Sequence, residues 1–494
     1  MIKAKSNSTA MQDKSFWKPR NLFSKRFLVA EGKSFLFDLN RCTGCGACVV
    51  ACTIENYDKQ EINWREIYTF NETRHPEVPL FSLSMACNHC GSPSCVENCP
   101  ALALSKDSQT GAVVVNPERC MGCKYCTWAC PYDAPRYNGS KGVIEKCDFC
   151  IERLRKDEAP ACVCSCPTNA LRLGDFEADN KPQQVAGFTD AGIQPAIRFK
   201  TLRKRQQVPE CTAPPANESV EELFVSSQNI PEPKINLKSE WTLLVFTSIA
   251  FILVALLTAV MSTSLTVNPF VFMGAGVLAM GLGTVHLGKK GRAFRAVFNF
   301  KHSWLSREII LFSAFLALSG TYLLFLPGYP VFGWAGVFIG FLSLFSIDRI
   351  YQVAMQVSPL NFHSAHTLFN GLYLAGILTG NIFIFGGAGL IKLSLYLHRK
   401  FHFKRQRKNT RPLVSLLRIS FGFIIPFIIL VLEPGFINGI YIFLIVSVIV
   451  GELIDRTEYY DELDIVTPQK QMLIDLEYLL KDAVKAPRRQ VSPY

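Results

Sequence analysis

The stretch Cys42-Thr43-Gly44-Cys45-Gly46-Ala47-Cys48 opens a series of four cysteine groups that dominates the first half of the chain. Between residues 42 and 166 lie seventeen of the eighteen cysteines, and sixteen of these form the four spaced groups. The first and third groups share the spacing C-x2-C-x2-C-x3-C, the second reads C-x2-C-x4-C-x3-C, and the fourth reads C-x2-C-x11-C-x3-C. A proline follows the last cysteine of the second, third and fourth groups. This regular spacing predicts metal ligands.

Thiolates select iron–sulfur clusters or zinc over hard cations. Three cysteines on one tight loop hold one cubane, and the fourth, before proline, ligates a neighbouring cluster. Sixteen thiolates at four per cluster therefore predict four [4Fe-4S] clusters. The crossed rule assigns Cys42, Cys45, Cys48 and Cys166 to cluster 1, Cys87, Cys90, Cys95 and Cys130 to cluster 2, Cys120, Cys123, Cys126 and Cys99 to cluster 3, and Cys147, Cys150, Cys162 and Cys52 to cluster 4.

Disulfides and structural zinc are the two other interpretations of these cysteines. Disulfide frameworks suit small secreted domains, and residues 1–34 lack the apolar core and cleavage site expected of a secretory leader. Zinc sites rarely show four C-x3-C endings at such regular intervals. We therefore expect clusters, and we expect Cys164 and Cys211, which lie outside the pattern, to be ordinary thiols.

Composition divides the 494 residues into a soluble half and a membrane half. Hydrophobic residues make up 49% of the chain, and they concentrate after Trp241. The expected architecture is an α+β, ferredoxin-like domain of short hairpins and small helices, followed by an all-α polytopic membrane helix bundle. Strands are expected at 35–38 and 113–117. The net charge of +12 lies largely in loops between apolar segments, so it indicates a membrane rather than nucleic acid.

These patterns divide the chain into five parts. We expect a basic arm at 1–34, a cluster domain at 35–206, a linker at 207–240, a membrane domain at 241–456 and a tail at 457–494. A helix needs about 20 apolar residues to cross a bilayer. Seven candidate spans fit this length: 241–261, 269–287, 306–326, 331–350, 367–386, 413–432 and 436–454. The stretch 387–398 either extends the fifth helix or lies in the interface.

Two loops of the membrane domain are rich in Lys and Arg. One follows the second expected helix (289–307) and the other follows the fifth (399–411). With three helices between them, the two loops face opposite sides, so the positive-inside rule cannot explain both.

Ionisable residues at the ends of membrane helices are functional candidates by default. His286 ends the second helix, Glu308 opens the third, and Arg349 and Tyr351 end the fourth. A quinone site needs an apolar slot, hydrogen-bond donors and a proton acceptor, for which histidine is suited. Seven helices would put Glu452, Asp455 and Arg456 on the opposite face, too distant for this site. A salt bridge or a snorkelling side chain is the simpler alternative for each residue.

Residues 35–200 resemble the iron–sulfur subunit of anaerobic dimethyl sulfoxide reductase, and residues 241–456 resemble the membrane anchor of the same enzyme. The motifs that carry the first resemblance are Cys87-Asn88-His89-Cys90, Cys120-Met121-Gly122-Cys123-Lys124-Tyr125-Cys126, Cys130-Pro131-Tyr132 and Lys146-Cys147-Asp148-Phe149-Cys150. The second depends on His286-Leu287-Gly288, Arg292-Ala293-Phe294, Leu305-Ser306-Arg307-Glu308, Arg349-Ile350-Tyr351 and Gly451-Glu452-Leu453-Ile454. Two subunits are thus fused in one polypeptide.

The resemblance implies an anchor that oxidises menaquinol, four clusters that carry electrons, and a separate catalytic subunit with a molybdenum bis-pterin cofactor. His286 and Glu308 correspond to residues that bear on quinol binding, and Arg292, Arg349 and Tyr351 are further candidates for the quinol site. The related nitrate reductase subunit has Trp and a three-iron centre where this chain has Cys123. The family's anchor has eight helices rather than seven. The resemblance also places the cluster domain in the periplasm at the inner membrane.

Two other functions remain open at this point. A quinone-reducing subunit of a molybdopterin dehydrogenase or sulfur-compound oxidoreductase would run the same components in reverse. A scaffold with purely structural clusters would need fewer than four. The terminal acceptor depends on the partner protein.

Overall fold

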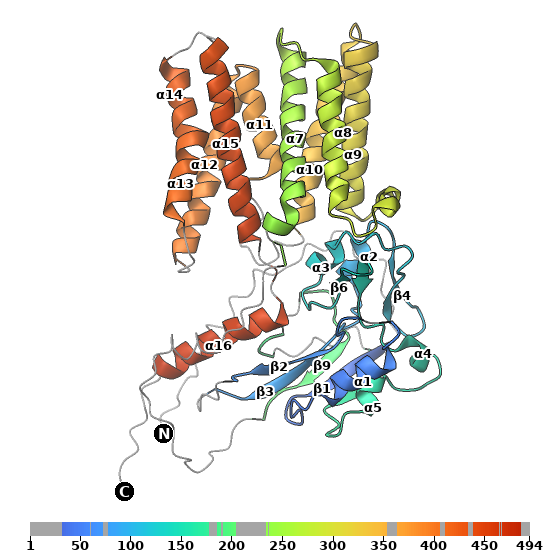
Figure 1. Cartoon of the computed structure of the whole chain (residues 1–494). Coiled ribbons are helices and arrows are strands. Elements are labelled where there is room, and N and C mark those ends of the chain that lie inside the picture. Colours follow the sequence, from blue (N-terminus) through green and yellow to red (C-terminus); the bar gives the residue numbers. More distant parts are fainter. Residues whose placement is uncertain are drawn as a thin grey trace.

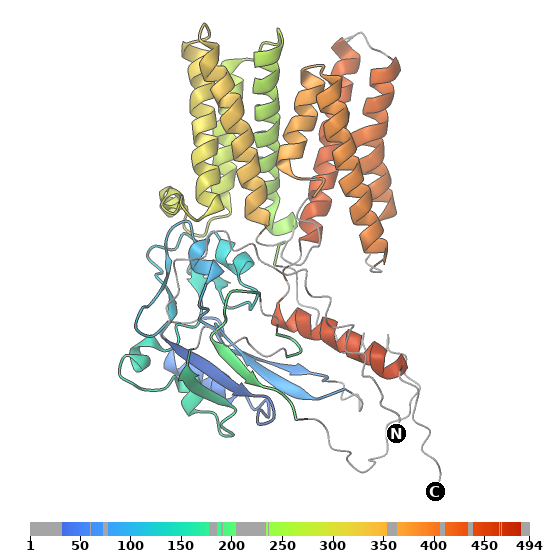
Figure 2. The same cartoon turned by 180° about the vertical axis from the view of Figure 1, so that it is seen from behind.

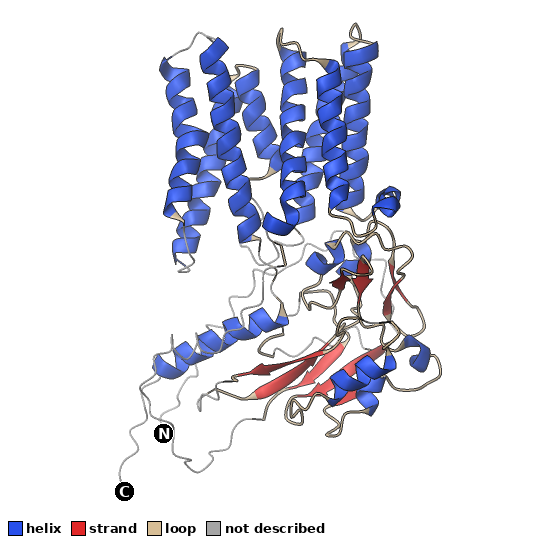
Figure 3. Cartoon of the chain, viewed as in Figure 1, coloured by secondary structure: helices blue, strands red, loops and turns tan. Residues whose placement is uncertain are grey.

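The computed structural model describes residues 32–59, 61–72, 78–176, 185–188, 191–203, 234–235, 237–352, 363–405, 411–432, 438–463, 465 and 467–485. Most of the expected arm and most of the expected linker lie outside these ranges. The described residues form a domain of small sheets and short helices, above which stands a bundle of long helices (Figures 1 and 3). The division predicted from composition is therefore present in space.

A three-stranded sheet lies at the base of the cluster domain. Strand β1 (Lys33–Asp38) is central, antiparallel to β8 (Leu171–Asp175) and parallel to β9 (Ile197–Lys200). Phe37 faces Leu171 on one side and Phe199 on the other, and all three side chains are buried. The strand predicted at 35–38 is confirmed, and the sheet joins the two ends of the cluster domain.

Three hairpins and five short helices carry the remaining cysteine loops. The hairpins are β2 (Glu66–Phe70) with β3 (Phe81–Met85), β4 (Leu104–Lys106) with β5 (Val113–Val115), and β6 (Arg136–Asn138) with β7 (Val143–Glu145). The helices are α1 (Ala47–Glu55), α2 (Ser94–Glu97), α3 (Tyr125–Ala129), α4 (Ile151–Leu154) and α5 (Ala161–Cys164). Each helix begins inside a cysteine group. The strand expected at 113–117 is present as β5, which ends two residues earlier, at Val115.

Among the described residues, the bundle contains eight helical rods standing side by side (Figures 1 and 2). They are α7 (Leu237–Ser262), α8 (Pro269–Val285), α9 (Trp304–Gly320) continued by the π-turn η4 (Thr321–Phe325), α10 (Pro330–Tyr351), α11 (Thr367–Leu378), α12 (Ile382–Arg405), α13 (Pro412–Ile419) continued by η5 (Ser420–Ile424) and α14 (Ile425–Leu432), and α15 (Asn438–Glu462).

Length and apolar composition alone qualify only some of these rods as membrane spans. The four that qualify are Glu240–Ser262, Trp304–Phe325, Pro330–Tyr351 and Pro412–Ile429. A fifth arises if α8 is taken together with η3 (Lys290–Val297), although the two are bent by 107°. The chain is thus a multi-pass membrane protein.

The single helix expected at 367–386 is wrong, because the structure has two helices there. Helix α11 ends at Leu378, Gly380 turns the chain with φ 65°, and the Asn381 side chain accepts hydrogen bonds from the first amides of α12. The stretch 387–398 lies within α12. The three residues 379–381 that separate these apolar helices leave no clear break in a hydropathy pattern, so the extra rod was missed.

The additional rod changes which residues share an end of the bundle. The ends of α8, α10, α12 and α15 all face the cluster domain (Figure 1). The two basic loops therefore lie at the same end, contrary to the sequence expectation. Glu452, Asp455 and Arg456 lie in the half of α15 nearer that end.

The expected tail is largely helical. Helix α15 continues to Glu462, beyond the expected boundary at 456, and α16 (Pro468–Lys485) then lies against the cluster domain. Met472, Leu476 and Leu480 of α16 belong to the cluster domain's buried core. The Asp475 carboxylate accepts a 2.8 Å hydrogen bond from the Gly187 amide. The chain thus contacts the cluster domain again after crossing the bundle.

Two glycines let α15 cross the rod formed by α13, η5 and α14. A Cβ added at Gly451 would overlap the backbone of Gly422, and one added at Gly422 would overlap the guanidinium of Arg418. The crossing therefore requires Gly451, as close helix contacts in membranes commonly require small residues, whereas a Cβ at Gly422 would meet α15 only at 3.6 Å.

We predict that Gly451→Ala will lower the free energy of unfolding by about 1–3 kcal/mol, because the added methyl group forces two backbones apart. Thermal unfolding of the purified protein in detergent measures the effect. Gly387→Ala in α12 is the matched control, since its Cβ meets no heavy atom within 4 Å. Equal stabilities of the two variants would contradict the proposed crossing.

Candidate functional site

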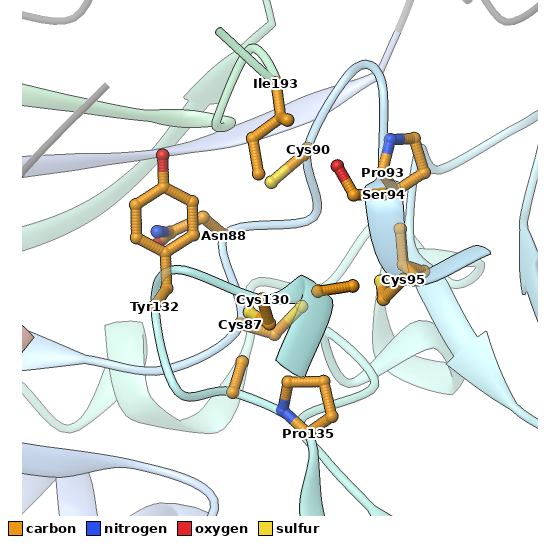
Figure 4. Close-up of a pocket in the computed structure, with 13 residues that line it drawn as sticks. Cys87, Asn88, Cys90, Pro93, Ser94, Cys95, Cys130, Tyr132, Pro135 and Ile193 are labelled. Atoms are coloured by element: carbon orange, nitrogen blue, oxygen red, sulfur yellow. The ribbon is translucent and has the colours of Figure 1, made fainter. Parts of the chain in front are cut away.

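Four cysteines from separate segments surround one cavity in the cluster domain. Cys87 and Cys90 come from the segment that joins β3 to α2, Cys95 lies in α2, and Cys130 follows α3. Tyr132 closes one wall of the cavity (Figure 4). This is the set that the sequence assigned to cluster 2.

The three other predicted sets also gather in space. In each set burial raises the pKa of a thiol, and neighbouring thiols of the same set raise it further. The neighbours are Cys48, Cys166 and Cys45 around Cys42, Cys162 and Cys150 around Cys52, and Cys123, Cys99 and Cys120 around Cys126. The crossed assignment thus joins residues that the fold brings together.

The chemistry of these sites fits an iron–sulfur cluster. Burial raises the pKa of Cys52 to about 12 and that of Cys150 to about 11, so a metal is needed to keep such thiols ionised. Within the described ranges no disulfide joins the cysteines, and no three His, Cys, Asp or Glu side chains are placed to hold a single ion. Thiols that surround a cavity rather than a point suit a cubane.

The loop that carries Cys120, Cys123 and Cys126 is one of the parts of the cluster domain that meet the bundle. The Tyr125 hydroxyl donates a 3.2 Å hydrogen bond to the Ile350 carbonyl at the end of α10. Tyr125 and Trp128 are buried in the same apolar cluster as the membrane helices. Cluster 3 is therefore the predicted cluster nearest the membrane.

Glycines allow the backbones of the two domains to come into direct contact at this junction. A Cβ added at Gly288, after α8, would overlap the carbonyl oxygen of Gly142 in the β6–β7 turn. Gly122, between two predicted ligands, lies against Gly288 and has φ 70°. The Lys289 amide donates a 3.1 Å hydrogen bond to the Met121 carbonyl. Any side chain at these glycines would push the cluster loop from the membrane.

Basic side chains of the loop after α8 hold the cluster domain by its carbonyl groups. Arg292 donates hydrogen bonds to Pro117 at 2.6 Å and to Cys120 at 2.8 Å, and Arg295 donates to Glu118 at 2.6 Å. Arg292 was a candidate for the quinol site, but the structure places its guanidinium in this docking contact. The first basic loop thus has a structural role.

His286 and Glu308 lie at the same junction. His286 is the C-cap of α8, and the Lys124 charge acts on its imidazole. Glu308, in the second turn of α9, is 6% exposed and forms no hydrogen bond or ion pair with any described residue. Burial raises the pKa of Tyr125, and the nearby Glu308 and Cys123 raise it further. Tyr125 therefore lies between Glu308 and a predicted cluster ligand.

Arg349 and Tyr351 form another wall of this junction. The Arg349 guanidinium lies 4.9 Å from the centre of the Phe345 ring. Tyr351 is buried beside Trp128, with ring centres 6.1 Å apart, and its hydroxyl is hydrogen-bonded to that of Tyr460.

Arg456 joins these residues, which corrects the expectation that it is too distant. Its guanidinium lies 5.2 Å from the Tyr351 ring and its charge acts on Glu308. Arg456 and Tyr460 were missed because an odd helix count put the end of α15 on the wrong face.

Comparisons with known proteins agree with this arrangement. The family described as "4Fe-4S dicluster domain" matches residues 78–176, "4Fe-4S binding domain" matches 33–53, and "DMSO reductase anchor subunit (DmsC)" matches 236–391. A component of the anaerobic dimethyl sulfoxide reductase of Haemophilus influenzae is 39% identical over 174 residues, which cover 33% of this chain and 82% of that protein. The chain therefore belongs to the family of dimethyl sulfoxide reductase iron–sulfur subunits. The anchor of that enzyme is fused behind it.

Two other relatives of this dimethyl sulfoxide reductase-type protein have different names. A tetrathionate reductase subunit of Salmonella typhimurium is 42% identical over 146 residues, covering 29% of this chain and 58% of the relative. The menaquinone reductase iron–sulfur subunit of Nitratidesulfovibrio vulgaris is 33% identical over 207 residues, covering 32% and 79%. Relatives of the cluster domain thus serve several redox enzymes.

A buried ion-pair network fills the other half of the reductase-type anchor. Glu452 pairs with Lys392 at 2.8 Å and with Arg418 at 3.1 Å, and Asp455 pairs with Arg418 and Arg399 at 3.2 Å each. These pairs join α12, α13 and α15, so they explain how a helix with several charges remains buried. The simpler interpretation of Glu452, a structural salt bridge, agrees with this placement.

We predict that Cys123→Trp will convert cluster 3 to a three-iron centre, because three thiolates remain and the unligated iron is lost. Electron paramagnetic resonance of the oxidised protein should show a three-iron signal, and iron content should fall from about sixteen to about fifteen per chain. Cys164→Ser removes an exposed thiol outside the four sets and is the control. An unchanged spectrum in Cys123→Trp would contradict the assignment.

Proposed function

We propose that this chain oxidises menaquinol at the junction of its two domains and delivers the electrons through four [4Fe-4S] clusters. The acceptor is a separate catalytic subunit with a molybdenum bis-pterin cofactor. The observation that carries the proposal is Glu308, a buried carboxylate that forms no hydrogen bond or ion pair with any described residue. The charges of Glu308 and Cys123 both raise the pKa of Tyr125. A membrane-buried ionisable group beside a redox-cluster loop is expected to handle protons.

Quinol oxidation releases two protons and two electrons, and the chain's own residues account for the protons. The imidazole of His286 and the carboxylate of Glu308 accept the hydroxyl protons of the quinol. Tyr125 and Trp128, packed on the ends of the helices, keep water from the junction. When bound, the clusters accept electrons one at a time.

The loop after α8 offers a route from the lipid to this junction. In η3 and the residues after it, Phe294, Phe298 and Phe300 are exposed beside Lys290 and Arg295. Aromatic and basic side chains of this kind accumulate at membrane interfaces. A lipid-soluble quinol would enter beside them and meet His286.

The names of the relatives support a partner subunit and a quinone. The dimethyl sulfoxide reductase and tetrathionate reductase relatives are each one component of a larger enzyme. The menaquinone reductase subunit supports menaquinone as the redox partner, and it also supports reverse electron flow as the second candidate function. Reduction of the clusters by added menaquinol in isolated membranes favours the first direction. Reduction only by the partner's substrate favours the second.

The resemblance to an exported reductase supports a periplasmic cluster domain. The positive-inside rule alone would put the end with both basic loops in the cytoplasm. Four of these cations are engaged in protein contacts, however: Arg292 and Arg295 with the cluster loop, and Arg399 and Lys400 with Glu458. Their positions therefore have a structural cause that is independent of membrane topology.

We predict that Glu308→Gln and His286→Ala will each slow menaquinol-dependent reduction of the clusters by about 100-fold, because a proton acceptor is lost. The rate is followed by cluster absorbance after quinol is mixed with the purified protein. Dithionite should still reduce all clusters in both variants.

His302→Ala is the matched control, since His302 is exposed on the same loop. Normal quinol-dependent rates in both Glu308→Gln and His286→Ala would reject the proposed site. Loss of the dithionite-reduced signal would instead indicate damage to the clusters.

We predict that a membrane-impermeant maleimide will label Cys164 in intact spheroplasts, because this thiol is exposed on the cluster domain. Cys211→Ser removes the other thiol outside the four sets, and Cys164→Ser gives the background. Labelling that requires lysis of the spheroplasts would place the cluster domain in the cytoplasm.

A further inference from the structure

Arg65 is a fully buried cation between two of the predicted clusters. It is 2% exposed, and its guanidinium donates a 2.9 Å hydrogen bond to the Ser84 hydroxyl. That hydroxyl lies 3.2 Å from the sulfur of Cys48, a ligand of cluster 1. The charge of Arg65 also acts on the thiols of Cys162 and Cys147, ligands of cluster 4. Arg65 thus faces clusters 1 and 4.

Lys146 is a second buried cation, and it faces clusters 4 and 2. It is 3% exposed, and its ammonium donates hydrogen bonds to the carbonyl groups of Val113 and Cys147. Its charge acts on the thiols of Cys87 and Cys95 in cluster 2 and of Cys147 in cluster 4. Lys146 therefore lies between the two sets.

Neither cation has an acidic partner in the part of the chain that the structure describes. Among those residues, no carboxylate forms an ion pair with Arg65 or Lys146, and the Nε and Nη2 atoms of Arg65 have no oxygen acceptor. Burying an uncompensated charge is strongly unfavourable. Four thiolate ligands make a bound [4Fe-4S] cluster anionic, so the clusters themselves supply the missing negative charge.

His89 connects clusters 2 and 4 in a second way. Its Nδ1 atom accepts a 3.0 Å hydrogen bond from the Val113 amide, so the ring proton of a neutral imidazole must be on Nε2. Nε2 lies 3.6 Å from the Cys147 sulfur and can donate to it. The ring stacks on Phe149 at 4.4 Å, which fixes its orientation. His89 thus extends from the loop of cluster 2 to a ligand of cluster 4.

We propose that Arg65 and Lys146 set the reduction potentials of the clusters, each acting on two of them, with cluster 4 under the influence of both. The proposal rests on the proposed function only for the presence of the four clusters. A cluster gains one negative charge on reduction, and a fixed cation beside it stabilises that form. Arg65 and Lys146 therefore raise the potentials of the clusters that they face.

Each substitution should therefore change the reduction potentials of a different pair of clusters. Lys146→Met should make clusters 2 and 4 harder to reduce, and Arg65→Met should do so for clusters 1 and 4. The expected change is about tenfold in the reduction equilibrium of each affected cluster, or about 59 mV for one electron. Cluster 3, which neither residue faces, should keep its potential in both variants.

Redox titration followed by electron paramagnetic resonance measures these potentials in the purified full chain, with dithionite and mediators and without quinol. The ligand variants Cys42→Ser, Cys87→Ser, Cys123→Ser and Cys147→Ser identify which signal belongs to which cluster. Arg65→Lys and Lys146→Arg retain the charge and should retain the potentials. If the Met variants assemble poorly, Arg65→Gln and Lys146→Gln replace them, and midpoints are read from the assembled fraction.

The expected outcome is the pattern of two shifted clusters in each variant, with cluster 4 shifted in both. Unchanged potentials, or equal shifts in all four clusters, would overturn the proposal and leave quinol oxidation untouched. A wild-type protein without reducible clusters would instead overturn the proposed function. Shifted reduction potentials in Arg65→Lys and Lys146→Arg, which retain the charge, would overturn the proposal by showing that packing rather than charge sets these potentials.

Discussion

The fold of the cluster domain depends on sixteen cysteines, in four predicted sets, that gather inside a small protein interior. Burial raises the pKa of several of these thiols, Cys52 and Cys150 among them, so bound metal would be needed to keep such thiols ionised. The secondary structure is arranged around the cysteines. Each short helix begins within a cysteine group, and the hairpins separate the loops that carry these groups. Arg65 and Lys146 show the complementary constraint, because their buried charges find no carboxylate among the described residues and are compensated by the clusters.

The junction between the domains brings the loop of the predicted cluster 3 against the ends of the membrane helices, where we propose quinol oxidation. Gly122, Gly142 and Gly288 bring three backbones into contact, and Arg292 and Arg295 hold the loop by its carbonyl groups. Tyr125 then lies between Glu308 and the ligand Cys123. Because electron transfer requires short distances, this close packing matters as much as the ligands do.

Sequence spacing predicted the sites that depend on local pattern. The spacing within each cysteine group, the strands expected at 35–38 and 113–117, and the candidates His286 and Glu308 follow from motifs within a few residues of one another. The crossed assignment of the cysteines to four clusters stays a prediction. The errors arose where distant segments meet. The turn at Gly380 has no apolar signature, so α12 was missed and Arg456 was assigned to the wrong face. The docking roles of Arg292 and α16 depend on contacts between domains, which no local pattern contains.

Helix α16 brings the end of the chain back to the cluster domain, so the two domains are joined by the covalent connection to α7 and by the packing of α16. The chain leaves the cluster domain, enters the bundle at α7, and comes back to the cluster domain through Met472, Leu476 and Leu480. Two subunits that would otherwise meet by diffusion are here held at a high effective concentration by tethers at both ends. Each membrane domain therefore has one cluster domain, and neither dilution nor unequal expression alters this one-to-one ratio.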